Sequence, residues 1–159
     1  MEAKSTDRKT FQLIDKEQIK GEVIYEHLFK LKGSIKLANS DEYEIKTEGV
    51  FSTSIHVIHQ GTKFASLKMN WRGQIVIAFE SGEQYILRSK GVFHNFYVLE
   101  NEAHEPLIQY DPTFEWSKFN YKYAISFNEK PQSDLLILLG VFASNYYIAT
   151  MSGATAVIV

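Results

Sequence analysis

Short runs of alternating apolar and polar residues fill the chain from Phe11 to Phe127. In Leu28–Leu37, apolar residues and one glycine occupy the odd positions, and lysine or serine occupies most of the even ones. Tyr121–Phe127 likewise has a large apolar side chain at every odd position. A period of two is typical of a strand with one buried and one solvated face. Glycine-containing turns such as Arg72-Gly73 and Ser81-Gly82 separate the runs, which is typical of antiparallel strands.

Eleven such runs are expected to be strands. They are Phe11–Ile14, Glu22–Tyr25, Leu28–Leu37, Tyr43–Thr47, Val50–Ile58, Lys63–Met69, Gln74–Phe79, Gln84–Leu87, Asn95–Leu99, Leu107–Tyr110 and Tyr121–Phe127. The chain has three prolines, at positions 106, 112 and 131, and we place each at a run boundary, where it disturbs no ladder. About ten to twelve half-buried antiparallel strands predict a barrel or sandwich with meander connections.

The pattern changes after Phe127. Ser133 and Asp134 are good helix N-cap residues, and the leucine-rich run that follows predicts a helix over about 134–151. In Leu135–Met151, 13 of 17 residues are apolar, and they lie on every side of the helix. A helix that is hydrophobic all round must be buried on all sides.

Two environments could bury this helix: a lipid bilayer or the interior of a barrel made by the strands. A bilayer span needs about 20 apolar residues, whereas Ser144-Asn145 falls near the middle of the segment and no Lys or Arg follows it. A helix of 17 residues is about 26 Å long, which is comparable to the height of a barrel. We therefore expect a mainly β fold: a closed antiparallel barrel of about 10–12 strands around one buried C-terminal helix, with a C-terminal membrane anchor as the alternative.

Composition places the chain among ordinary one-domain globular proteins. It has 159 residues, 45% hydrophobic and 23% charged, with a net charge of −2 and no cysteine. The small net charge gives no global attraction to nucleic acid or to an anionic membrane, so any such contact must be local. The missing cysteines remove disulfides and thiolate chemistry. Residues 1–10 are polar with mixed charges, so we expect a flexible arm there, followed by a single domain over 11–159.

The order of elements resembles the tubby-like barrel superfamily, which includes tubby C-terminal domains, phospholipid scramblases and LURP-one-related proteins. The residues that carry the resemblance are Gly82–Gly91, the strand His94–Leu99 and the helix Asp134–Tyr147. The likeness is greatest to the LURP-one-related group and rests on architecture more than on a motif. It implies a tubby-like barrel without enzymatic activity or cofactor, in a superfamily in which some members bind phosphoinositides or act at membranes. No functional motif of the family can be matched here residue by residue.

Candidate catalytic and metal chemistry is sparse. His56 and His59 are three positions apart, so on a strand they point to opposite faces and cannot easily hold one ion. The nucleophile elbow Gly-x-Ser-x-Gly and glycine-rich phosphate loops are absent from the sequence. Paired carboxylates at Asp41-Glu42 and Glu100/Glu102 are typical of solvated turns. We therefore predict no catalytic residue and no metal site.

The most plausible functional surface is basic. Lys30, Lys32 and Lys36 share the polar face of one expected strand, and Arg88 and Lys90 alternate on another. Trp71-Arg72 places an aromatic ring beside a cation at a turn. Ammonium groups on a rigid sheet could hold an anionic phospholipid headgroup, although lysines on strand faces also serve simply to block edge pairing. Glu100 to Glu115 carries five carboxylates and no Lys or Arg. A surface polarised in this way would orient the molecule at an anionic membrane.

Three functions remain open from the sequence. The first is a monomeric, cytoplasmic or peripheral-membrane module that binds phosphoinositide, another anionic phospholipid or a protein partner without catalysis. The second is a tail-anchored membrane protein whose β domain ends near Phe127. The third is a barrel that binds a small ligand, against which the apolar helix argues because it would fill the interior.

Overall fold

The structure is a computed structural model that describes residues 1–26, 31–48, 54–131 and 133–152. It contains twelve strands and one helix in these residues. The strands are β1 (Glu2–Ser5), β2 (Thr10–Asp15), β3 (Gln18–Tyr25), β4 (Gly33–Leu37), β5 (Glu42–Thr47), β6 (Ser54–His59), β7 (Thr62–Met69), β8 (Ile75–Phe79), β9 (Gln84–Lys90), β10 (Phe96–Asn101), β11 (Pro106–Glu115) and β12 (Asn120–Ser126), and the helix is α1 (Asp134–Met151).

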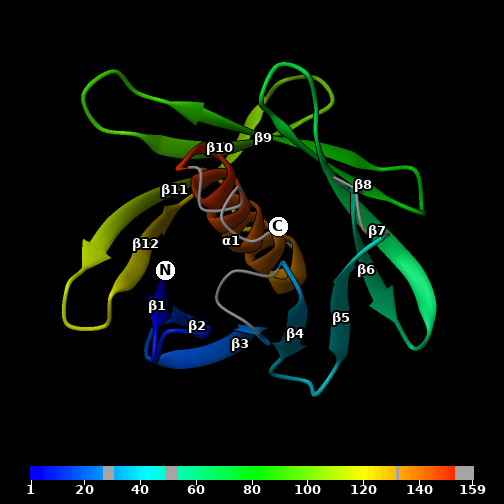
Figure 1. Cartoon of the computed structure of the whole chain (residues 1–159), viewed down its shortest axis with the longest axis horizontal. Coiled ribbons are helices and arrows are strands. Elements are labelled where there is room, and N and C mark those ends of the chain that lie inside the picture. Colours follow the sequence, from blue (N-terminus) through cyan, green and yellow to red (C-terminus); the bar gives the residue numbers. More distant parts are fainter. Residues whose placement is uncertain (27–30, 49–53, 132, 153–159) are drawn as a thin grey trace.

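Each strand pairs antiparallel with its neighbours in sequence, and β1 pairs with β12 to close the barrel. The ring of strands surrounds α1, which is drawn from orange to red in Figure 1. The predicted fold class is therefore confirmed: the protein is mainly β, a closed antiparallel barrel of twelve strands with a single C-terminal helix packed against it.

The alternation in the sequence becomes the two faces of the barrel wall. Ile35 on β4 and Tyr123 on β12 are fully buried, whereas Lys36 is exposed. The inward-facing side chains of the strands pack with those of α1 into a single hydrophobic core. Most strands keep this alternation, and β10 departs from it because residues 97–100 are all buried. A closed barrel has no edge strand to interrupt the pattern.

The helix begins where its cap residues predict. Ser133 is the N-cap and its hydroxyl accepts a hydrogen bond from the backbone N–H of Leu136. Every residue in 135–144 is buried. By length and composition, α1 is the one helix in the described part of the chain that could cross a membrane, a test that core helices also pass. Its burial places it in the barrel interior, the environment that we favoured from the sequence.

Several boundaries differ from the sequence prediction. The expected flexible arm is wrong for Glu2–Ser5, which forms β1 and pairs with both β2 and β12. Pro112 lies inside β11 and not at a boundary. It is tolerated because β10 pairs with β11 only as far as Tyr110, so β11 has a single partner strand there. The long strand predicted over Leu28–Leu37 shortens to β4, and its residues 28–30 lie outside the described part of the chain.

Candidate functional site

The meander places alternate connections at opposite ends of the barrel. One end is here called the exit end, and its described connecting residues are 6–9, 26, 31–32, 48, 70–74, 91–95 and 116–119. The helix starts from the other end, here called the opposite end, because β12 finishes there. The helix then terminates at the exit end: a Cβ placed on Gly73, in the β7–β8 connection, would lie 3.4 Å from Cε of Met151.

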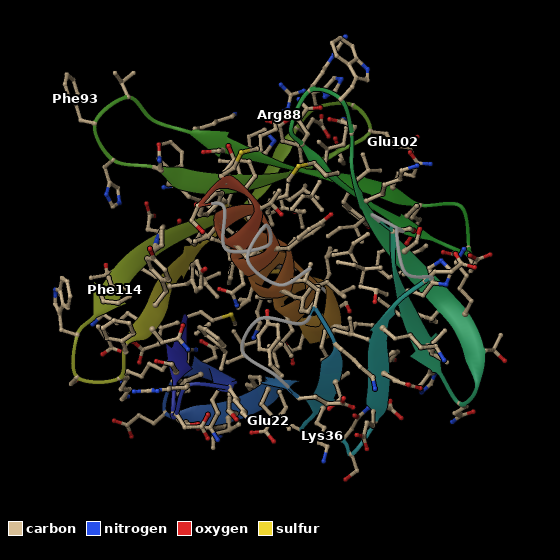
Figure 2. All side chains as sticks on the ribbon, viewed as in Figure 1. Glu22, Lys36, Arg88, Phe93, Glu102 and Phe114 are labelled. Carbon is tan, nitrogen blue, oxygen red and sulfur yellow. The ribbon has the colours of Figure 1, made fainter. Side chains whose placement is uncertain are left out.

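Large apolar side chains are exposed almost entirely at the exit end. Six of the seven exposed large hydrophobic residues among the described residues lie there, and Ile19 is the exception. We call these six the aromatic rim: Trp71, Val92, Phe93, Trp116, Phe119 and Met151. Figure 2 shows Phe93 at the tip of the β9–β10 hairpin, beyond the C-terminal end of α1, with Lys36 on the other side of the molecule. Exposed large apolar side chains that gather at one end of a protein are typical of an interaction site.

The β7–β8 turn holds the first rim tryptophan in a defined position. The side-chain oxygen of Asn70 accepts hydrogen bonds from the backbone N–H groups of Arg72 and Gln74, both at 3.0 Å. This geometry is an Asx turn, which fixes a tight connection. The guanidinium of Arg72 lies 4.8 Å from the ring centre of Trp71, within cation–π range. The turn therefore presents an aromatic ring and a cation together, while Trp71 remains 88% exposed.

The β11–β12 hairpin carries a packed aromatic cluster. Phe114 contacts the rings of Trp116 and Phe119 at centroid distances of 4.9 and 5.6 Å. Lys118 crosses to the barrel wall, where its Nζ donates a 2.7 Å hydrogen bond to the carbonyl oxygen of Ser5. These contacts hold the hairpin against the barrel. Trp116 and Phe119 are therefore exposed side chains that still pack against Phe114.

The two ends also differ in charge. Among the described residues, the exit-end connections carry five cations and three carboxylates: Arg8, Lys9, Lys32, Arg72 and Lys118 against Asp7, Glu26 and Glu48. The connections of the opposite end carry two cations and seven carboxylates: Lys16 and Lys130 against Glu17, Asp41, Glu80, Glu83, Glu102, Glu105 and Glu129. The molecule is thus polarised along the barrel axis, with the more positive charge on the same end as the aromatic rim.

The cations predicted from the sequence do not form one site. Lys30 lies outside the described residues. Lys32 pairs with Glu26 at 3.0 Å, and Lys36 pairs with Glu42 at 3.9 Å. Lys36 is also at the far end of β4, away from the aromatic rim. Four strands separate β4 from β9, where Arg88 and Lys90 lie, so the two predicted groups are on different parts of the wall.

Arg88 and Lys90 are engaged by a buried carboxylate. Glu100 on β10 is 3% exposed, and its two oxygens lie 3.0 Å from Nε of Arg88 and Nζ of Lys90. The Arg88–Glu100 contact is an ion pair without hydrogen-bond geometry. His104 lies 3.6 Å from the same carboxylate. Since an unpaired carboxylate is costly to bury, this network accounts for both cations as partners of Glu100.

Two exit-end cations without such partners among the described residues are Arg8, which the sequence analysis did not single out, and Arg72, which it noted only as the neighbour of Trp71. Within the described part of the chain, neither Arg8 nor Arg72 pairs with a carboxylate. The usable signal in the sequence was apolar residues at turn positions: the Trp71-Arg72 pair, Val92-Phe93, and Trp116 with Phe119. Turns do not need large apolar side chains for their geometry, so their presence there indicates a surface that contacts something.

The histidines that suggested a metal site have other contacts. Nε2 of His56 lies 3.1 Å from a carboxylate oxygen of Glu48, and the ring of His59 stacks on Tyr43 at 4.3 Å. In the ranges that the structure describes, no group of three or more His, Cys, Asp or Glu side chains converges as metal ligands would.

Comparisons of the chain with protein-family profiles, with curated proteins and with solved structures find no match, so they neither support nor contradict the resemblance to tubby-like barrels.

Proposed function

We propose that this protein is a non-catalytic module that docks on anionic membrane surfaces through the exit end of its barrel. The observation that carries the proposal is the coincidence of the aromatic rim with the more basic end of a polarised molecule. Tryptophan favours the membrane interface, where its amphipathic ring sits at headgroup level. Cations near an anionic leaflet contribute about 1 kcal/mol each.

The expected strength follows from partial burial of the rim. Fully burying an apolar side chain of this size contributes about 1.5–3 kcal/mol. Half-burial of Trp71, Phe93 and Trp116 would therefore contribute about 3 kcal/mol, or about a hundredfold in membrane partitioning. Such binding is reversible, and it uses the same end at which α1 emerges.

The chain supplies its own probe for this proposal. It has two tryptophans, Trp71 and Trp116, and both belong to the aromatic rim. We expect their fluorescence to shift to shorter wavelength when vesicles containing phosphatidylserine or a phosphoinositide are added, and to be quenched by lipids brominated on their acyl chains. Vesicles of phosphatidylcholine alone should give a weaker response, because they lack the anionic charge.

Two variants separate the rim from general adhesion. Changing Trp71, Phe93 and Trp116 together to serine should weaken vesicle sedimentation about a hundredfold. Ile19→Ser removes an exposed apolar side chain at the opposite end and should leave sedimentation unchanged. Equal loss in both variants, or no binding by the wild type at low salt, would overturn the proposal and favour a protein partner for the rim. Recovery of the protein only with detergent, resistant to carbonate, would instead favour the tail-anchored alternative.

A further inference from the structure

A pocket of about 220 Å³ opens at the exit end, between the last two turns of α1 and the inner faces of β2, β3 and β12. Its helix wall is formed by Asn145, Ile148, Ala149 and Ser152. These positions are spaced i, i+3, i+4 and i+7, so they share one face of the helix. One side of the pocket is therefore a single face of the helix.

The other side of this part of the helix is packed. Tyr146 is buried, the ring of Tyr147 contacts Tyr97 at 5.4 Å, and Met151 lies by the β7–β8 turn. This side of the last helical turns thus has packed neighbours, and the pocket lies on the other side.

The base of the pocket is polar, and its polar side chains are hydrogen-bonded to one another. Asn145 accepts a 2.6 Å hydrogen bond from the hydroxyl of Tyr123, and its amide donates a 3.1 Å bond to the hydroxyl of Tyr25. Burial raises the pKa of both tyrosines, so both stay neutral at physiological pH. The base requires no charged ligand, and above it Phe11, Ile148 and Ala149 provide apolar walls.

One cation lines the opening. Arg8 belongs to the exposed β1–β2 connection, and within the described residues it has no carboxylate partner. The adjacent Asp7 is occupied, because its carboxylate accepts hydrogen bonds from the backbone N–H groups of Lys9 and Thr10 at 2.7 and 2.8 Å. An apolar pocket whose lining includes an arginine without a carboxylate partner among the described residues is complementary to a ligand with a hydrocarbon tail and an anionic head.

We propose that this pocket binds a single-chain anionic amphiphile, with its alkyl chain against Ile148 and Ala149 and its acidic head at Arg8. The inference rests on the proposed function, since docking of the aromatic rim would bring the pocket mouth to the membrane in which such molecules dissolve. At about 220 Å³ the pocket is suited to a segment of one alkyl chain and not to a two-chain lipid.

The test uses soluble probes below their micelle threshold, namely decanoate and uncharged decanol, with isothermal titration calorimetry on the full chain. We expect decanoate to bind, and Arg8→Gln to weaken it about tenfold while leaving decanol unchanged. Ala149→Phe fills the pocket and should abolish binding of both. Ala38→Phe adds the same ring at an exposed position of the opposite end and should bind like the wild type.

Near-ultraviolet circular dichroism verifies that each variant is folded. If Ala149→Phe unfolds the protein, Ile148→Trp serves as a second variant that fills the pocket.

The outcomes separate this inference from the proposed function. The serine variant of the rim should lose vesicle binding and keep decanoate binding, because its three substitutions lie outside the pocket. Vesicle binding without decanoate binding would overturn the pocket assignment alone. Decanoate binding that survives both pocket-filling variants would overturn it as well. Decanoate binding without vesicle binding would overturn the docking proposal and leave a soluble amphiphile-binding barrel.

Discussion

Gly140 is the position at which a tyrosine hydroxyl reaches the backbone of α1. The hydroxyl of Tyr110 donates a 3.1 Å hydrogen bond to the carbonyl oxygen of Ile137, one turn earlier in the helix. A Cβ at Gly140 would lie 1.9 Å from that hydroxyl oxygen, and Tyr110 is fully buried, so its ring has nowhere to move. The missing side chain therefore serves the packing of helix against wall and not helix flexibility.

Gly140→Ala tests this contact, because two effects oppose each other. In an exposed helix, alanine would add about 1 kcal/mol relative to glycine. Here overpacking should cost about 1–3 kcal/mol beyond that gain. We expect a lower free energy of unfolding in urea. In the double variant with Tyr110→Ala, the additional cost of Gly140→Ala should disappear. An increase in stability for the single variant would contradict the contact.

At the scale of elements, the sequence predicted well the features that depend on neighbouring residues, such as helix caps and strand alternation. The cap at Ser133 and the alternation around Ile35 are readable because they depend on neighbours in sequence. Strand β1 was missed because Glu2–Ser5 has a single apolar residue, Ala3, and becomes a strand only by filling the gap between β2 and β12. Closure of a barrel is a property of all twelve strands together, which no short window contains.

The sequence did not identify the candidate site, for a related reason. Alternation identified Arg88 and Lys90 as outward-facing cations, and both are engaged by Glu100 from the neighbouring strand. Which carboxylate faces which cation depends on strand register, and register was not available. The aromatic rim depends on another long-range fact, namely that hairpins 20 or more residues apart along the chain reach the same end of the barrel.

Helix α1 should be required for folding. Its buried stretch contains seven large apolar side chains in 135–142. Together they contribute roughly 10–20 kcal/mol, which matches or exceeds the net stability of a domain at about 5–15 kcal/mol. We expect a chain ending at Lys130 to be insoluble or to unfold without cooperativity. A soluble truncation with a sharp urea transition would refute the core role of the helix.

A matched pair of substitutions refines that prediction without truncation. Leu138→Asp places a carboxylate where the side chain is fully buried, whereas Met151→Asp places one where the side chain is 53% exposed. The first should prevent cooperative folding because an isolated buried charge is very costly, and the second should leave the unfolding midpoint nearly unchanged.

At the scale of the whole molecule, the polarised charge predicts an orientation. The helix spans about 27 Å from end to end, whereas the Debye length is about 10 Å at 0.1 M salt. A membrane at the exit end therefore senses Arg8 and Arg72 but not the charges of the opposite end. Binding by net charge alone would make no such distinction between the ends.

Charge reversals of equal size at the two ends decide between these cases. Arg8→Glu with Arg72→Glu should weaken binding to anionic vesicles at least thirtyfold, because removing two cations alone costs about 2 kcal/mol. Lys16→Glu with Lys20→Glu makes the same change in net charge at the opposite end and should weaken binding less than threefold. Vesicle sedimentation at 0.1 M salt measures both, with phosphatidylcholine vesicles as the uncharged reference. Equal losses would mean that the protein responds to net charge and does not dock by one end; a loss confined to the first pair would fix the exit end as the face turned to the membrane.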